Sequence, residues 1–184
     1  RAVLMAEQTA AGRCRNRGTP HTEAIIPWLD KPGVPLIGPS TGAMSLHQPV
    51  RKHVFNVRAT YQREAEKAIT HLVTISMIKI ALVYSDDSFG ADGVAGAQKG
   101  LTAASLTPAA LEKFDRAKPD FSIIGPQIAK SGAQAVMIIA AGTAVVDCLK
   151  AVRAAGSSAQ IVPLPTNASG GFIKSLGGKE QGVM

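Results

Sequence analysis

The sequence predicts an α/β fold in which parallel strands alternate with helices. Two segments that are rich in β-branched and other apolar residues, 79–84 and 135–139, support this prediction. They lack the in-and-out alternation of a half-exposed strand, which is typical of parallel strands covered on both faces. Each segment is followed by turn residues and then by a helical pattern, the order of elements found in βαβ units.

The first half of the chain has the same order of elements. A helix is predicted over 22–30, where a Pro-Gly pair stops it, and a strand follows at 34–37. A weaker strand at 53–57 leads into a helix over 61–75. The apolar residues of this helix form one stripe, as expected of a helix that packs on a sheet: Ala65, Ala68, Ile69, Leu72 and Val73.

In the second half, the first apolar strand is followed by a loop and by a helix that ends at Leu101. The second is followed by a helix over 144–155, which Gly156 closes. A last strand is predicted at 160–164. Strands that alternate with helices in this way are joined by crossovers into a parallel sheet.

Composition and charge exclude several classes of protein. The net charge is +7, but residues 1–92 carry 11 basic against 8 acidic residues (+3) and residues 93–184 carry 9 against 5 (+4). The densest basic group has no interleaved aromatic residues that could stack on bases: Arg13, Arg15 and Arg17. We therefore expect no nucleic-acid partner. No apolar run approaches the about 20 residues of a membrane span, and the start of the chain shows no signal-peptide pattern.

The sequence lacks motifs for catalysis, metals and cofactors. It contains no G-x-S-x-G elbow, no G-x-G-x-x-G fingerprint and no P-loop. Cys14 and Cys148 do not have zinc-ligand spacing, and Cys148 is expected to be a buried thiol. The histidines also lack metal-ligand spacing: His21, His47, His53 and His71. We expect no catalytic residues, no metal and no cofactor.

Ligands of parallel α/β sheets bind at the carboxyl ends of the strands, where loop amides and helix N-termini converge. In the loop after 34–37, Ser40 and Thr41 suit a carboxylate or phosphate, because hydroxyls and free amides donate hydrogen bonds to an anion. Capping of the following turn is the alternative. Four loops lie in this position: Gly38–Ser45, Ser85–Gly90, Ala140–Thr143 and Pro165–Gly171.

Two further features also have alternative interpretations. The pair Asp86-Asp87 suits a metal or a cofactor ribose, but without a glycine fingerprint we favour a carboxylate near a helix N-terminus, where the dipole stabilises it. The segment around His21 has a hydroxyl on each side, from Thr19 and Thr22. These residues either contact a ligand or cap the helix that follows.

Five blocks of the sequence, taken in chain order, resemble segments of the type I periplasmic binding proteins. The closest group is the leucine/isoleucine/valine-binding branch, the substrate-binding subunits of branched-chain amino-acid ABC importers. The resemblance extends from Gly18 to Met184. The blocks that carry it are Gly33–Ser40, Val54–Arg58, Lys79–Gly90, Asp120–Ser122 and Ala135–Ile138.

The resemblance implies a fold of two Rossmann-like lobes, with parallel sheets flanked by helices. Residues 1–75 would belong to the first lobe and residues 76–184 to the second, ending near a hinge crossing. It further implies a monomeric, non-catalytic protein of the periplasm or cell exterior. Such a protein closes by hinge motion on a small ligand, a branched-chain or other apolar amino acid, and delivers it to an ABC permease in the membrane.

The resemblance also implies a set of ligand-binding residues. In similar proteins, hydroxyls and backbone groups of the first lobe hold the α-carboxylate and ammonium of the ligand. An aromatic residue of the second lobe covers the ligand at the position of Phe89, which offers apolar packing but no hydroxyl. First-lobe contacts would be Thr19, Ser40, Thr41 and Gly42, and the further lining residues Tyr61, Gly142, Thr143 and Thr166.

The sequence departs from the family pattern in two places. The segment Pro165–Ser169 lacks the acidic residue that would pair with a ligand ammonium. Either the acid lies elsewhere, or the ligand is a small aromatic or aliphatic carboxylate; a ligand-sensing domain and an α/β enzyme are further alternatives. The segment 10–17 is polar where the family has a hydrophobic strand. We therefore expect residues to be missing there, and a longer natural gene product.

Overall fold

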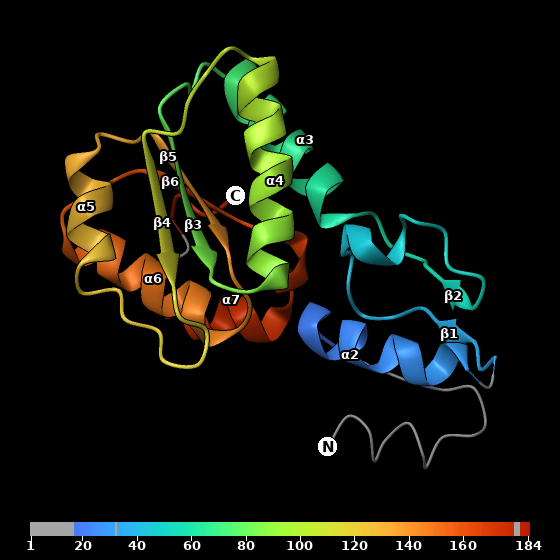
Figure 1. The fold of residues 1–184 in the computed structure, drawn as a ribbon. Helices are drawn as coiled ribbons and strands as arrows, with labels where there is room; N and C mark the ends of the chain where they lie inside the picture. The colour runs from blue at the N-terminus through green and yellow to red at the C-terminus, as the bar shows by residue number, and fades with distance from the viewer. Residues whose placement is uncertain (1–16, 32, 179–180) are drawn as a thin grey trace. The chain divides into compact units, whose positions relative to one another are not determined.

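The computed structural model of the protein describes residues 17–31, 33–178 and 181–184, and its elements are shown in Figure 1. The chain divides into two compact units, Arg1–Arg63 (unit 1) and Glu64–Met184 (unit 2). Cys14 and nearly all of the segment in which missing residues were expected lie outside the described residues. No helix in the described part of the chain is long and apolar enough to cross a membrane.

The described part of unit 1 contains a helix and two short parallel strands. The elements are α2 (Thr19–Asp30), β1 (Leu36–Ile37), the 3-10 turn η1 (Met44–Leu46) and β2 (Val54–Phe55). The Leu36 amide donates to the His53 carbonyl over 2.7 Å, and the Gly38 amide donates to the Phe55 carbonyl over 2.9 Å. Apolar side chains of α2 pack on this sheet and on η1. Ile25 and Leu29 cluster with Leu36 of β1, and Ile26 clusters with Leu46 of η1.

Both strands of unit 1 are shorter than predicted. Pro35 has no amide hydrogen with which to extend the ladder of β1. On the other side, Gly38 has φ 58°, a left-handed conformation that ends the strand. After β2, the Asn56 side chain donates to the Leu46 carbonyl over 2.7 Å.

Unit 2 has a four-stranded parallel sheet in the order β4-β3-β5-β6. Helix α3 precedes this sheet and begins at the boundary between the units. In chain order the elements are α3 (Tyr61–Thr74), β3 (Ile80–Ser85), α4 (Ser88–Ala103), β4 (Ala110–Phe114), α5 (Ile124–Lys130), β5 (Ala135–Ile139), α6 (Thr143–Ala154), β6 (Gln160–Pro163), η2 (Pro165–Asn167) and α7 (Gly170–Leu176).

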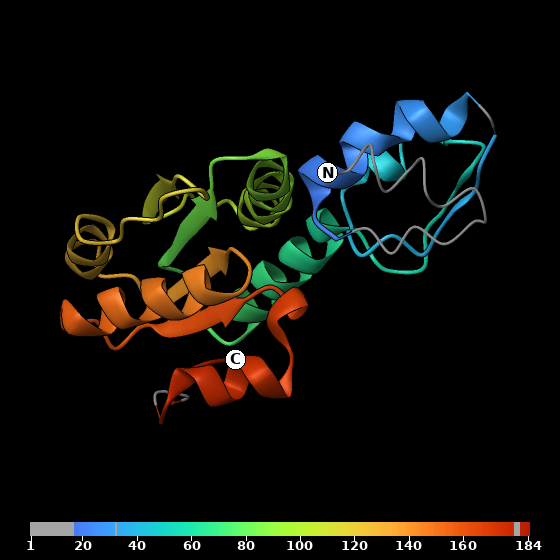
Figure 2. The same cartoon turned by 90° about the horizontal axis from the view of Figure 1, so that it is seen from below.

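Helices cover both faces of this sheet (Figure 2). Val83 and Ile138 are buried on the face that packs against α5 and α6. Strand alternation turns Leu82 and Ile139 to the other face. There α4 comes so close that a Cβ on Gly93 would lie 2.5 Å from Ile139 Cγ2. Burial on both faces explains why β3 and β5 are apolar at nearly every position, and it confirms the predicted α/β fold class.

Helix α3 packs tightly against α4. A Cβ on Gly100 would lie 3.0 Å from the Cβ of Ile69 and 3.1 Å from the Glu66 carbonyl oxygen. This packing explains why the units divide at 63/64, at the start of α3. The lobe boundary at 75/76, which the resemblance implies, remains a proposal.

Candidate functional site

In unit 1, the loops that follow β1 and β2 lie side by side. The Tyr61 amide donates to the Gly42 carbonyl over 2.8 Å. A Cβ on Gly42 would lie 2.4 Å from the Ala59 carbonyl oxygen, so only glycine allows this close approach. The ring of Tyr61 is buried, and the guanidinium carbon of Arg58 lies 5.0 Å from its centroid. Gly42 and Tyr61, two predicted site residues, are therefore neighbours.

Two of the predicted first-lobe hydroxyls bind each other. Thr19 Oγ1 and Thr41 Oγ1 are 2.8 Å apart, and both residues are buried. Thr41 Oγ1 also accepts a bond from the Ala43 amide over 3.3 Å. This hydroxyl pair ties the start of α2 to the loop after β1. Ser40, the third hydroxyl residue predicted in the first lobe, has an exposed side chain.

Of the two interpretations of Thr19 and Thr22, the one in which a threonine side chain caps α2 is wrong. The N-cap is Gly18, at φ 97°, and no side chain caps the helix. The Thr22 hydroxyl instead donates to the Gly18 carbonyl over 2.8 Å. His21 is exposed on the first turn of the helix.

In unit 2, Asp87 is the N-cap of α4. Its Oδ1 accepts bonds from the Gly90 amide and the Ser85 hydroxyl, each over 2.9 Å. Its Oδ2 accepts a 2.6 Å bond from Nη1 of Arg116. Burial alone would raise the pKa of Asp87, but these hydrogen bonds and the nearby Arg116 charge lower it below its ordinary value. The helix-terminus interpretation of this carboxylate is confirmed.

The neighbouring carboxylate is also paired with a cation. Asp86 Oδ2 lies 3.0 Å from Nζ of Lys113, on β4, and both side chains are exposed. The hydrogen bond to Asp86 raises the pKa of Lys113. Within the described ranges, no group of three or more His, Cys, Asp or Glu side chains could hold a metal ion.

Phe89 lies in the first turn of α4 and is only 4% exposed. Arg116 partly covers it, with the guanidinium carbon 5.9 Å from the ring centroid. Sequence reasoning did not identify Arg116. It lies two residues beyond β4, and the sequence analysis did not predict that strand.

The predicted residues after β5 and β6 come together at one edge of the sheet. Asn167 is buried; its Nδ2 donates to the Ala140 carbonyl over 2.9 Å, and its Oδ1 accepts a 3.2 Å bond from the Gly142 amide. This side chain joins the two loops. Gly142 and Thr143 are exposed, and Thr166 is partly buried beside Asn167.

A separate apolar pocket of about 440 Å³ lies between the end of β6 and α7. Sequence reasoning did not anticipate it, and it contains none of the predicted ligand-binding residues. Its lining includes Leu164, Phe172, Ile173, Leu176 and Met184.

The chain is similar to solved structures of solute-binding proteins. A substrate-binding periplasmic protein from Ralstonia solanacearum is 25% identical, with a TM-score of 0.86; the match covers 99% of this chain and 53% of that one. A possible leucine/isoleucine/valine-binding protein from Rhodopirellula baltica SH 1 is 21% identical, with a TM-score of 0.85, covering 98% and 50%. A solute-binding protein of an ABC transporter from R. palustris, in complex with 4-hydroxybenzoate, is 18% identical, with a TM-score of 0.81, covering 97% and 50%.

The chain spans about half the length of these proteins. The likenesses confirm the expected fold of type I periplasmic binding proteins. No curated protein matched the sequence. Residues 7–184 match the family described as periplasmic binding protein. Because this match covers more than half of the sequence, the chain belongs to the periplasmic binding protein family.

Proposed function

We propose that the protein is a non-catalytic, extracytoplasmic solute-binding protein that delivers a small carboxylate with an apolar body to an ABC importer. Family membership supports binding and delivery of a solute. The chemistry of the loops after the strands supports the class of ligand. The ligand-binding residues predicted in each unit are part of this proposal.

The observation that carries the choice of ligand is the pairing of the acidic residues that follow β3. Asp86 and Asp87 are each bound to a cation, Lys113 and Arg116 respectively. The loops that follow β5 and β6, residues 140–142 and 164–169, contain no acidic residue. An amino acid needs a negative partner for its ammonium, because a desolvated, unpaired charge is costly. A carboxylate without an ammonium has no such need.

Unit 1 offers a hydrogen-bond donor that suits an oxygen of the ligand. Ser40 exposes a hydroxyl on the loop after β1. The Thr19–Thr41 hydroxyl pair and the Gly42 contact hold this loop in one conformation. A fixed donor binds an anion at a lower entropic cost than a mobile one. The complex of the R. palustris protein with 4-hydroxybenzoate supports an aromatic acid as one member of this ligand class.

A branched-chain or other apolar amino acid is the second candidate. The likeness to the possible leucine/isoleucine/valine-binding protein of Rhodopirellula baltica favours it. On this alternative, an acidic residue outside the loops after β3, β5 and β6 would pair with the ammonium. The two candidates share the carboxylate and the apolar body, and they differ in the ammonium.

A thermal-shift panel tests the proposal. The natural protein is heated with 4-hydroxybenzoate, benzoate, hexanoate, leucine or valine, and each compound is recovered afterwards and analysed for chemical change. A compound at a hundred times its Kd stabilises the protein by about 2.7 kcal/mol. We expect a shift with at least one carboxylate and its recovery unchanged. Conversion of the compound would indicate an enzyme, and no shift from a folded protein would contradict solute binding by this chain.

A further inference from the structure

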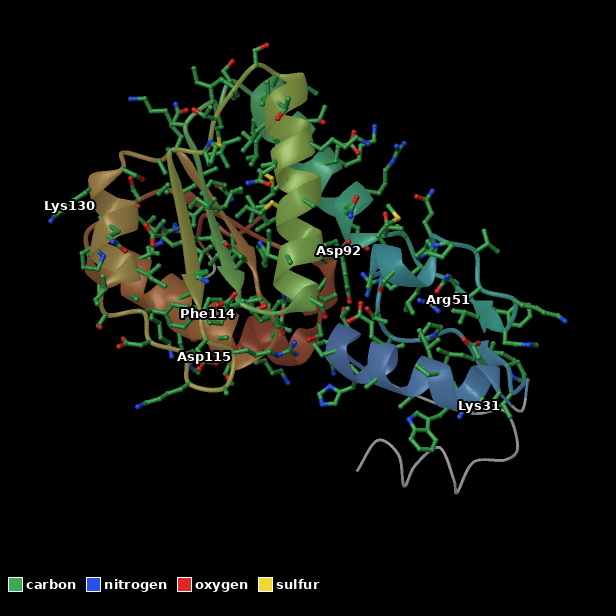
Figure 3. All side chains as sticks on the ribbon, viewed as in Figure 1. Lys31, Arg51, Asp92, Phe114, Asp115 and Lys130 are labelled. Atoms are coloured by element: carbon green, nitrogen blue, oxygen red, sulfur yellow. The ribbon has the colours of Figure 1, made fainter. Side chains whose placement is uncertain are left out.

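Arg116 lies beside the buried ring of Phe89, at the sheet edge where ligands of parallel α/β folds bind. It comes two residues after β4, at the carboxyl end of the sheet of unit 2. The two residues before it, Phe114 and Asp115, are labelled at the lower end of β4 in Figure 3. Its guanidinium carbon is 5.9 Å from the centroid of the Phe89 ring, within the range of a cation–π interaction.

The guanidinium is held in place by a carboxylate that is itself fixed. Nη1 of Arg116 donates to Oδ2 of Asp87 over 2.6 Å. The other oxygen of that carboxylate accepts bonds from the Gly90 amide and the Ser85 hydroxyl. Asp87 therefore has bonds to three groups on different elements. A cation anchored in this way loses little further side-chain entropy when it binds an anion.

Arg116 keeps donors for a second partner. A guanidinium has five N–H groups in a planar fork, and the bond to Asp87 uses one of them. The side chain is 43% exposed, so the remaining donors are accessible from solvent. The fork matches the two oxygens of a carboxylate, and such bidentate pairs are among the stronger hydrogen bonds in proteins.

We propose that Arg116 determines the specificity of this protein for carboxylates, by binding the carboxylate of the ligand. This inference rests on the proposed function and names the residue that would carry its selectivity. Lys113, the other cation at the end of β4, is the natural comparison. Its ammonium pairs with the exposed Asp86, and among the described residues it makes no cation–π contact, although Tyr84 is its partner across the β3–β4 pairing.

The test compares Arg116→Met, Arg116→Lys and the control Lys113→Met with the natural protein. Isothermal titration measures the affinity of each for 4-hydroxybenzoate and for its neutral analogue 4-hydroxybenzamide. A charge-assisted bond of this kind contributes on the order of 10- to 100-fold in affinity. We expect Arg116→Met to lose this factor for the acid while its affinity for the amide stays unchanged. Arg116→Lys should lose less, because it keeps the charge but not the fork, and Lys113→Met should match the natural protein.

Two results would overturn the role of Arg116. One is an Arg116→Met variant that binds the acid as tightly as the natural protein. The other is an equal loss for acid and amide, which indicates damage to the structure; circular dichroism of the ligand-free variant checks that it is folded. If the natural protein binds neither 4-hydroxybenzoate nor any other carboxylate of the panel, the proposed function itself fails. If leucine is the compound that binds, leucine and leucinamide form the test pair.

Discussion

Replacing Gly42 by alanine should destabilise unit 1 and disturb its candidate site. The added Cβ would lie 2.4 Å from the Ala59 carbonyl oxygen, about 1 Å short of the closest ordinary contact of 3.4 Å. The obstacle is backbone, so no side chain can rotate away. Moving the loop apart would also stretch the 2.8 Å bond from the Tyr61 amide to the Gly42 carbonyl.

The cost of this substitution follows from three contributions. Overpacking costs about 1–3 kcal/mol, and the weakened hydrogen bond adds about 1 kcal/mol. Alanine also restricts the unfolded chain, which returns about 0.4–1 kcal/mol. We expect the free energy of unfolding to fall by about 1–3.5 kcal/mol in total.

The assay uses the single tryptophan of the chain. Trp28 lies on α2, in unit 1, so its fluorescence during urea denaturation reports that unit, while circular dichroism reports both. Gly170→Ala is the matched control, because an added Cβ there meets no heavy atom within 4 Å. An unfolding free energy of Gly42→Ala within about 0.5 kcal/mol of the natural protein would refute the close contact between the two loops.

Three further predictions concern unit 2. The pKa of Asp87 is lowered, so its charge stabilises the fold at pH values above 3.8, and this contribution is lost as the pH falls through the folded-state pKa. Asp87→Asn, which keeps a capping side chain, should therefore be less stable than the natural protein by about 1 kcal/mol at pH 7, and the difference should shrink as the pH falls below 3.8. A pH-independent difference in urea denaturation would contradict this. Burial raises the pKa of Cys148 to about 12, so peptide mapping should find it unmodified by iodoacetamide at pH 8 until the protein unfolds; labelling of the folded protein would show that the thiol is accessible. Asn167→Ala removes the bonds to Ala140 and Gly142 and should increase amide hydrogen exchange in both loops; unchanged exchange would mean that Asn167 does not join them.

The sequence predicted the elements whose burial leaves a clear pattern. Strands β3 and β5 are covered on both faces and are therefore apolar at nearly every position. The edge strand β4 was missed, because Glu112 and Lys113 interrupt its apolar residues on a partly exposed strand. Helix α5 was missed because it is short and contains Gly125 and Pro126. The glycine is needed there, since a Cβ would lie 2.6 Å from the Ala151 carbonyl oxygen of α6.

The sequence predicted which loops form the candidate site, but not which side chains contact one another there. Parallel strands place their following loops at one edge, and this rule located Ser40. Phe89 was expected from the family resemblance. The bond between Thr19 and Thr41 joins residues 22 positions apart, and no periodicity encodes it. Arg116 was missed together with β4, because its position beside Phe89 depends on the pairing of that strand with β3.

The central claim is that the ligand is a carboxylate without an ammonium group, so that the protein needs no acidic residue to pair with one. Calorimetric titration of the natural protein with two matched pairs tests it most directly: 4-methylpentanoate against leucine, and 3-phenylpropanoate against phenylalanine. Within each pair the carbon skeleton and the carboxylate are the same, and the ammonium is the sole difference. In the pair that binds, the account predicts that the acid without the ammonium binds at least as tightly as the amino acid. Tight binding of the amino acid alone would contradict the account and require an acidic partner for its ammonium.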